Sequence, residues 1–158
     1  MIHYKTKLAT VRTSRLEDIK PIAKHMRIED VEELWKSHNR TPEEALMIAF
    51  KDSTECLTVE KNGKPIAMFG VAPNSLSGDE TTIWLVGTPK IEKVQRAFGK
   101  HSKDFIEKML KIYPILSNYV DVTNKKTIKW LKWCGAKFGS AVPYGINGEL
   151  FMRFEFRR

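Results

Sequence analysis

The segment from residue 118 to residue 138 constrains the fold more than any other part of the chain. Residues 119–122 are mostly β-branched or aromatic and predict a strand, and Asn124 follows as a helix-capping side chain. Over residues 125–134, lysines recur on one helical face and apolar side chains fill the other. Gly135 stands where a left-handed residue ends a helix, and an apolar segment begins directly after it. This order of strand, short helix and strand predicts one αβ unit of a mixed domain.

The hydrophobic period divides the remaining chain into helical and extended parts. Ser14 and Glu17 form a capping-box pattern that predicts the start of a helix, and Thr41, which precedes a proline, predicts another. Asn62 and Gly63 predict a tight turn between two antiparallel strands. The expected helices span residues 15–26 and 28–37, a third begins at residue 41, a long one ends at residue 113, and the expected strands span residues 8–12, 56–61, 64–72, 81–87, 115–122, 136–142 and 150–156.

The excess of positive charge lies in one part of the chain. The sequence has 27 basic and 19 acidic residues, and twelve of the basic but only four of the acidic residues lie between residues 90 and 137. Such a field attracts phosphate groups, either of nucleic acid or of a phosphorylated cofactor such as coenzyme A. The alternative is that these lysines occupy solvated helix faces and contribute only solubility. Nucleic acid is the less favoured partner, because aromatic residues are not interleaved with the lysines in a recognisable binding motif.

Composition narrows the class of protein further. Cys56 and Cys134 are too few for a disulfide scaffold and lack metal-ligand spacing, so we expect no metal site. No apolar run approaches the ~20 residues of a membrane span, and the first residues contain no apolar signal segment. The chain has no linker, internal repeat or low-complexity segment. We therefore expect residues 1–158 to form one domain that works in the cytoplasm and not in a membrane.

The late helix and strand resemble a known superfamily. The residues that carry the resemblance open the helix, fill its first turns and mark the following strand: Asn124, Thr127, Ile128, Trp130, Gly135 and Phe138. They resemble the corresponding segment of the GNAT superfamily of N-acetyltransferases, and the element order β-α-α-α-β-β-β-α-β-α-β-β is similar to the arrangement in that superfamily. The resemblance implies a mixed α/β (α+β) GNAT-like fold. Its mostly antiparallel sheet would have about six or seven strands, with diverging middle strands and about four or five flanking helices.

Five segments carry a closer resemblance: residues 25–38, 41–46, 68–73, 84–88 and 119–139. They are similar to a family of small GNAT-like proteins of tailed bacteriophages, which includes the internal virion protein A of short-tailed phages. This resemblance implies a protein of the host cytoplasm or the virion. It leaves two functional hypotheses: an acetyl-CoA-dependent N-acyltransferase whose amine acceptor, such as a host or phage protein, is unknown, or a non-catalytic protein that acts in virion morphogenesis or binds a host factor.

The superfamily resemblance implies acetyl-CoA contacts in two segments. A bulged central strand would present backbone groups to the thioester, and a turn before a helix would bind the pyrophosphate. The implied contact residues are Trp84, Leu85, Val86 and Gly87 on the strand, Arg96, Phe98, Gly99, Lys100, His101 and Ser102 around the turn, and Asn124 at the later helix. Arg96 and Gly99 match the superfamily motif, whereas His101 replaces its last small residue. The alternative is an ordinary buried strand followed by a glycine tolerated inside a helix.

Acid and base groups are the hardest residues to assign. Many enzymes of the superfamily place a tyrosine seven residues after the helix-opening asparagine, but this chain has Leu131 there, which has no proton to donate. Tyr119 and Tyr144 are the substitutes for a general acid. Glu80, Asp121 and His101 lie near the expected cleft as proton acceptors, although each also fits a solvated or capping role.

Overall fold

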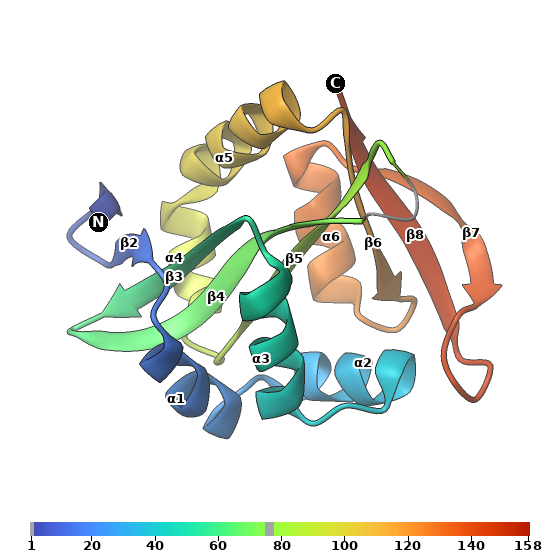
Figure 1. Ribbon diagram of the computed structural model, residues 1–158, viewed down its shortest axis with the longest axis horizontal. Helices are drawn as coiled ribbons and strands as arrows, with labels where there is room; N and C mark the ends of the chain where they lie inside the picture. The colour runs from blue at the N-terminus through green and yellow to red at the C-terminus, as the bar shows by residue number, and fades with distance from the viewer. Residues whose placement is uncertain (1, 75–77) are drawn as a thin grey trace.

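The framework of the protein is one eight-stranded sheet (Figure 1). The structure is a computed structural model that describes residues 2–74 and 78–158. The strands are β1 (Ile2–Lys5), β2 (Thr10–Thr13), β3 (Glu55–Lys61), β4 (Lys64–Pro73), β5 (Glu80–Gly87), β6 (Ile115–Asp121), β7 (Lys137–Pro143) and β8 (Leu150–Arg157). They lie in the order β1-β2-β3-β4-β5-β6-β8-β7, and every neighbouring pair is antiparallel except β5 and β6, which run parallel.

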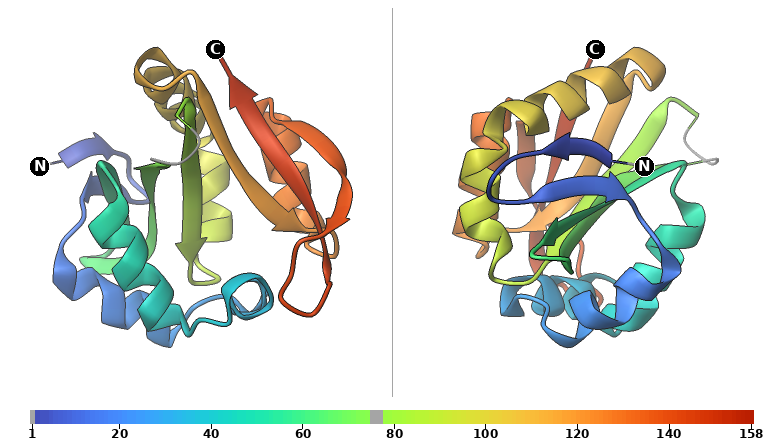
Figure 2. Two further views of the ribbon diagram at one scale, coloured as in Figure 1. Left: turned by 45° about the vertical axis from the view of Figure 1, so that its right-hand side comes forward. Right: turned by 90° about the vertical axis from the view of Figure 1, so that its left-hand side faces the viewer.

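Helices cover both faces of the sheet and one of its ends. The described chain contains α1 (Ile19–Lys24), α2 (Ile28–His38), α3 (Pro42–Asp52), α4 (Ile91–Ala97), α5 (Gly99–Ile112) and α6 (Lys125–Cys134), with a 3-10 turn (Leu16–Asp18) before α1. Helices α4, α5 and α6 cover one face, α1 and α3 cover the other, and α2 lies at the lower end between them (Figure 2). The mixed α/β GNAT-like fold class is therefore confirmed. Fewer strands were expected than are present, because β1 at the edge of the sheet was not predicted. Fewer helices were expected, because the predicted long helix is divided into α4 and α5.

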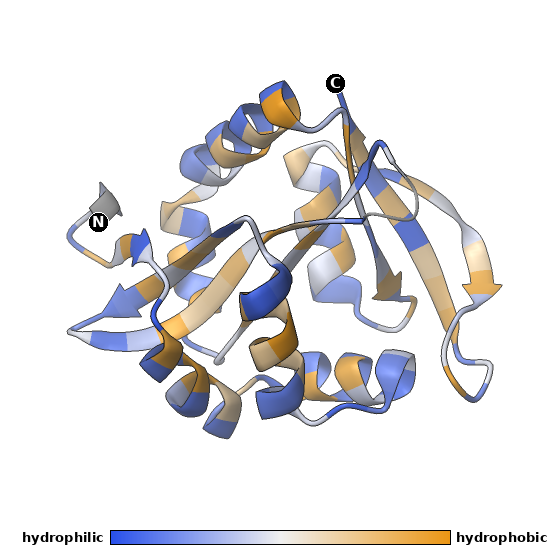
Figure 3. Cartoon of the chain, in the orientation of Figure 1, coloured by the Kyte–Doolittle hydropathy of each residue, from blue (hydrophilic) through white to orange (hydrophobic). Residues whose placement is uncertain are grey.

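Hydrophobic side chains form two clusters, one on each face of the sheet. The larger lies beneath α4, α5 and α6 and includes Ile91, Phe98, Leu116 and Ile128. The smaller lies beneath α1 and α3, around Ile22 and other residues of that face. Figure 3 shows the matching pattern on the helices, whose ribbons alternate between hydrophilic and hydrophobic residues. In the part of the chain that the structure describes, every helix is too short or too polar to span a bilayer.

Three local signals in the sequence have the geometry that they predict. The Thr41 hydroxyl accepts a hydrogen bond from the Glu44 N–H at 3.3 Å and caps α3. Asn62 and Gly63 both have positive φ angles, 52° and 75°, as the turn between β3 and β4 requires. Gly135 ends α6 in the left-handed region at φ 98°. These signals succeed because each depends on backbone geometry within a few residues.

The capping box expected at Ser14 and Glu17 is wrong. The Ser14 hydroxyl lies 2.7 Å from the Thr58 hydroxyl, and Asp18 caps the first turn instead by accepting from the Arg15 N–H at 2.8 Å. Asp18 is buried, and two 2.8 Å hydrogen bonds from the Arg12 guanidinium compensate its charge. The helical turn therefore begins one residue later than expected, with Arg15 as its N-cap, where Asp18 pairs with Arg12 of β2.

Candidate active-site cleft

Strands β5 and β6 separate after a short parallel contact. Only Glu80–Thr82 pairs with Ile115–Ser117, and beyond this the two strands diverge toward their carboxyl ends (Figure 2, left). At the fork, the Asn118 side-chain amide donates to the Ile83 carbonyl at 2.8 Å, and its own carbonyl oxygen accepts from the Tyr119 N–H. Asn118 thus replaces the backbone ladder at the point where it stops, and the expected divergence of the middle strands is present.

A cavity of about 270 Å³ lies at this fork. Its walls come from β5, β6 and helices α2, α4, α5 and α6, and most of its lining atoms are apolar. Ligand pockets are commonly ~300–1,000 Å³ and apolar with a few polar groups, so this cavity has the size of a narrow arm more than of a whole nucleotide. The fork is therefore hollow and accessible, which a binding site between the strands requires.

Leu85 turns its backbone polar groups into the fork. The Ile83 carbonyl accepts from the Asn118 side chain. The Gly87 N–H donates to Asp30, and the Gly87 carbonyl accepts from the Arg27 N–H. These groups of Ile83 and Gly87 therefore face away from β4. Alternate residues of an antiparallel ladder direct their N–H and C=O groups to the same side. Leu85 lies between Ile83 and Gly87 and lines the cavity, so its N–H and C=O face the open space between β5 and β6.

The predicted strand residues have different surroundings. Trp84, Leu85 and Val86 line the cavity. Gly87 does not offer a free backbone group, since its N–H donates to Asp30 Oδ2 at 3.0 Å and its carbonyl accepts from the Arg27 N–H at 2.8 Å. The expected bulge is absent from the described β4–β5 register, which runs without a shift. A Cβ on Gly87 would lie 3.1 Å from the Ile66 carbonyl oxygen, so the glycine permits a close approach of β4.

Most of the segment from Arg96 to Ser102, where a turn before a helix is expected, is helical, and Phe98 forms the turn that precedes α5. Helices α4 and α5 meet at Phe98, whose N–H donates to the Val94 carbonyl and whose carbonyl accepts from the Ser102 N–H. Because α5 begins at Gly99, the N–H groups of its first turn have no carbonyl partner within the helix. Pyrophosphate binding at this helix N-terminus stays a prediction.

Gly99 has a packing role at the start of α5. A Cβ there would lie 2.8 Å from the Trp133 ring, so the glycine lets α6 approach closely. Phe98, His101 and Ser102 line the cavity, whereas Arg96 and Lys100 are exposed. The imidazole of His101 lies against the rings of Tyr4 and Phe98. Cofactor contact by these residues stays a prediction.

Helix α2 bridges the two diverging strands at the open end. Asp30 accepts from the Gly87 N–H at the end of β5. One turn later, Glu33 Oε1 accepts from the Asp121 N–H at the end of β6 and from the Asn124 side chain, both at 3.0 Å. The spacing of three places both carboxylates on one helix face. Asn124 also caps α6 by accepting from the Thr127 N–H, so the predicted cap is connected to the cleft through Glu33.

The carboxylates at this end differ in their charge partners. Asp30 is held by the Arg27 guanidinium at 3.0 Å and Asp121 by the Lys36 ammonium at 2.8 Å, while Glu33 is held by two neutral donors. Burial raises the pKa of Glu33 to about 7, although the hydrogen bonds from Asn124 and Asp121 act in the opposite direction. Burial also tends to raise the pKa of Asp121, but hydrogen bonds from Lys36 and Thr123 outweigh it and the net pKa is lowered.

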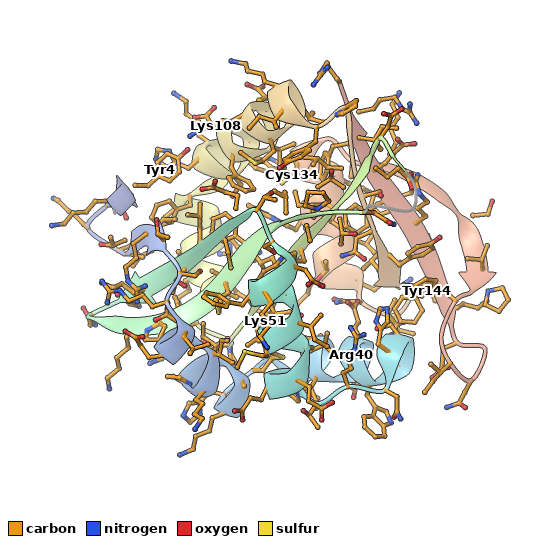
Figure 4. The ribbon with its side chains drawn as sticks, viewed as in Figure 1. Tyr4, Arg40, Lys51, Lys108, Cys134 and Tyr144 are labelled. Carbon is orange, nitrogen blue, oxygen red and sulfur yellow. The ribbon has the colours of Figure 1, made fainter. Side chains whose placement is uncertain are left out.

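The predicted acid and base residues divide into two groups. Glu80 forms an ion pair with Arg153 at the closed end of the fork, and Asp121 is paired with Lys36. Tyr119 and Tyr144 line the cavity with their rings stacked at 3.8 Å, and burial raises the pKa of Tyr144. Figure 4 shows Tyr144 close to Arg40, which follows α2. The tyrosine pair is thus at the cavity, while both predicted carboxylates are engaged by cations.

Leu131 and Cys134 of α6 also line the cavity. Burial raises the pKa of the Cys134 thiol to about 11, with Lys103 lowering it slightly, so the thiol is protonated at neutral pH and is not an activated nucleophile. In residues 2–74 and 78–158, no group of three or more His, Cys, Asp or Glu side chains is arranged to hold a metal ion.

Three residues at the cleft were not predicted from the sequence: Asn118, Asp30 and Glu33. A polar residue within the β-prone run of β6 was the only available signal for Asn118. Asp30 and Glu33 lie among other acidic residues on α2, and nothing in the sequence distinguishes them from solvated neighbours such as Glu32. Their roles depend on contacts across more than 50 residues of chain, with Gly87, Asp121 and Asn124.

The unfolding free energy should depend on pH through Glu33. A carboxyl whose pKa rises from 4.5 to about 7 on folding stabilises the folded state while it is protonated. We expect the unfolding free energy to decrease by about 3 kcal/mol as the pH rises from 4.5 through 7. Urea titrations of wild type and Glu33→Gln at each pH isolate this effect, since shifts at Asp30 and His38 are common to both. Parallel pH curves for the two proteins would contradict the prediction.

Comparison with solved structures identifies the fold. The spermidine N-acetyltransferase of Vibrio cholerae, solved with CoA and spermine, superposes with a TM-score of 0.69 and 16% identity, covering 96% of each chain. The ribosomal-protein-S18-alanine N-acetyltransferase of Escherichia coli gives 0.64 and 17%, covering 95% of this chain and 94% of that one. Ard1 from Thermoplasma volcanium gives 0.69 and 12%, covering 95% and 97%. The fold is therefore that of GNAT acetyltransferases, while such low identities carry no activity with them.

Sequence comparison identifies the family. The family described as "Bacteriophage T7, probable scaffold protein Gp13" matches residues 55–142, more than half of the chain. The probable scaffold protein gp13 of Escherichia phage T7 is 35% identical over 107 residues, which cover 65% of this chain and 72% of the T7 protein. The matched segment includes β5, β6 and α4 to α6, which form most of the cleft. This chain belongs to the phage T7 Gp13 family, whose members include a probable scaffold protein, and it has the GNAT fold.

Proposed function

We propose that this protein binds an acyl-coenzyme A thioester in the β5–β6 cleft and transfers the acyl group to an amine. The observation that carries the proposal is the backbone of Leu85, which faces an apolar cavity at an open fork of the sheet. A preorganised N–H in a site of low dielectric stabilises charge that develops on a carbonyl oxygen. A second observation supports it: the carboxylate of Glu33 lies at the same opening and lines the same cavity.

The residues of the cleft fit the pantetheine arm of coenzyme A better than its phosphates. Apolar walls suit a narrow pantetheine arm, and a bound thioester would supply an electrophilic carbonyl near Leu85. The phosphates would meet no extended loop of amides, and the first-turn N–H groups of α5 are the backbone donors available there. The exposed lysines of these helices, including Lys93 and Lys100, are the cations available to them. We therefore expect affinity that decreases as salt is added.

Isothermal titration with acetyl-CoA and with CoA tests the proposal directly. We expect saturable micromolar binding of both, weakened at higher ionic strength. Glu107→Gln, which changes one exposed charge on α5, serves as a second preparation that should bind both ligands like wild type. Absence of heat with either ligand, in a protein whose thermal unfolding is cooperative, would exclude the acyltransferase function.

Leu131→Tyr should increase acyl transfer. Leu131 lines the cavity at the position where many enzymes of the superfamily carry the tyrosine that protonates the departing thiolate. General acid catalysis contributes ~10²–10⁴-fold in favourable geometry, so we expect roughly a tenfold gain from an unoptimised hydroxyl. Leu131→Phe is the matched control, because it adds the ring without the hydroxyl. Equal rates of free-thiol release for the two variants would contradict the prediction.

A non-catalytic role in virion assembly is the second candidate function. It is favoured by the family, which includes a probable scaffold protein of phage T7, and by two departures from the superfamily pattern, His101 and Leu131. Under this alternative, the fold would serve as a binding surface and the cavity would be a remnant. The titration above separates the two candidates, because only the first requires that coenzyme A binds.

A further inference from the structure

The open end of the cleft has more acidic groups than cations to pair with them. Three carboxylates meet there: Asp30 and Glu33 from α2 and Asp121 from β6. The guanidinium of Arg27 is committed to Asp30 through two 3.1 Å hydrogen bonds. The ammonium of Lys36 is committed to Asp121 at 2.8 Å. Glu33 is thus the carboxylate whose described partners are all neutral, and a positive ligand would complete the set.

We infer that Glu33 binds the ammonium group of the acceptor amine and takes a proton from it. Within the described chain, both hydrogen bonds to this side chain use Oε1, which leaves Oε2 to meet a ligand. Glu33 lines the cavity, so its carboxylate adjoins the space in which the thioester would lie. The inference rests on the proposed function for the transfer step, while the ammonium site can be tested without it.

Aromatic side chains on the same wall favour a cation. The stacked rings of Tyr119 and Tyr144 line the cavity, and His38 contacts the Tyr144 ring edge-on at 6.2 Å. Cations are attracted to aromatic faces, by ~0.5–2 kcal/mol depending on exposure. Burial lowers the pKa of His38, and Arg40 acts in the same direction, so both favour the neutral imidazole, which does not repel an ammonium. The wall therefore combines a carboxylate that no described cation pairs with and neutral rings, with Arg40 acting on Tyr144 and His38.

The charged groups around Glu33 are compatible with a proton acceptor near neutral pH. Asp30 and Asp121 act on Glu33 through their charge, and Asn124 bonds to it. The cations Arg27 and Lys36 pair with Asp30 and Asp121, while Tyr119 and Tyr144 line the same cavity and Arg40 acts on Tyr144. The nearby negative charges of Asp30 and Asp121 add to burial in raising the pKa of Glu33 to about 7. Catalytic bases work best when their pKa is close to the working pH.

The transfer step balances with Glu33 as the base. The ammonium gives one proton to Glu33 and becomes a neutral amine, whose nitrogen lone pair forms the new C–N bond at the thioester carbonyl carbon. The Leu85 N–H lies on the wall where the carbonyl oxygen gains charge. Breakage of the C–S bond expels the sulfur, which takes a second proton from the nitrogen. The products are the amide, the free thiol and a protonated Glu33 that releases its proton to solvent.

The ammonium site can be measured without coenzyme A. We expect n-propylammonium to bind wild type and to lower the titration midpoint of the Glu33 carboxyl, followed by carbon-13 NMR of labelled glutamate side chains. Glu33→Gln should abolish binding, and because its amide oxygen still accepts from Asp121 and Asn124, it should remain folded. Glu32→Gln is the matched control, since Glu32 is exposed on the same helix. An unchanged Glu33 midpoint at saturating propylammonium would overturn the inference.

The catalytic part is measured by thiol release from acetyl-CoA with propylamine as acceptor. We expect Glu33→Gln to reduce the rate about 100-fold or more. In wild type the rate should increase with pH with a midpoint near 7, and this midpoint should disappear in Glu33→Gln, a change that loss of packing alone does not produce.

The two experiments fail in different ways. Acetyl-CoA binding without any effect of propylammonium on Glu33 overturns the inference and keeps the proposed function. An ammonium-dependent shift of Glu33 without acetyl-CoA binding keeps the ammonium site and overturns acyl transfer. Glu33→Asp retains the charge but withdraws it by one methylene, so wild-type binding and rate in that variant would also overturn the assigned position of the carboxylate.

Discussion

Asp18→Ala should lower the unfolding free energy by about 2–3 kcal/mol, because it removes one of the two carboxylates that pair with the buried Arg12 guanidinium and leaves only Glu60. Arg12 and Asp18 are 5% and 2% exposed and share two 2.8 Å hydrogen bonds. Asp18 also accepts from the Thr58 hydroxyl and the Arg15 N–H, so the change leaves several buried donors without an acceptor. Equilibrium denaturation in urea measures the difference. Such a loss is a large fraction of the ~5–15 kcal/mol by which a domain is stable.

Two controls separate the buried pair from charge in general. Glu92→Ala removes the same charge from an exposed ion pair with Lys126, and we expect a change within about 0.5 kcal/mol. A double variant with Arg12→Met and Asp18→Leu removes both buried charges together and should recover much of the lost stability. If Asp18→Ala and Glu92→Ala lose similar stability, the N-terminal layer does not depend on this pair.

Gly70→Ala should destabilise the protein by about 3 kcal/mol or more, because the added methyl group meets rigid backbone. A Cβ on Gly70 would lie 2.3 Å from the Glu55 carbonyl oxygen and 3.3 Å from both Cys56 Cα and the Trp84 ring. Gly70 is in the middle of β4, paired on both sides, so neither neighbouring strand can withdraw without losing its ladder. Thermal unfolding followed by circular dichroism gives the change in Tm.

Gly139→Ala is the matched control for Gly70. Gly139 also lies in a strand, β7, but a Cβ there would only touch the Arg153 carbonyl oxygen at 3.7 Å, which is ordinary contact. We expect this variant to be neutral or slightly stabilised, because alanine reduces the freedom of the unfolded chain by ~0.4–1 kcal/mol. Equal losses in the two variants would show that the cost arises from glycine replacement in general and not from the close approach at Gly70.

The candidate site was only partly predictable from the sequence. The strand residues Trp84, Leu85 and Val86 line the cavity as the resemblance implied, since they follow from a strand at the right place in the order. Around Arg96 to Ser102 a single turn residue, Phe98, precedes α5; Gly99 permits a close helix contact with Trp133, and its role in phosphate binding stays a prediction. A glycine required for packing and a glycine required for a turn look identical in a sequence.

The sequence by itself determined the elements and most of their ends. Thr41, Asn62 and Gly135 act through backbone geometry within one turn of the chain, so local spacing was sufficient to predict them. Periods of 3.6 and two residues likewise report which side of an element is buried. The GNAT-like order of helices and strands followed from these local signals together with the resemblance.

Only the tertiary structure decided which acidic residues matter. Asp18, Asp30 and Glu33 look like ordinary surface carboxylates of helical segments, yet the fold buries the first two and brings the third to the cleft. Their environments are set by partners such as Gly87 and Asp121, which are distant along the chain. Burial and charge pairing depend on how elements pack in three dimensions, and for that reason no local pattern could distinguish Glu33 from its exposed neighbour on α2.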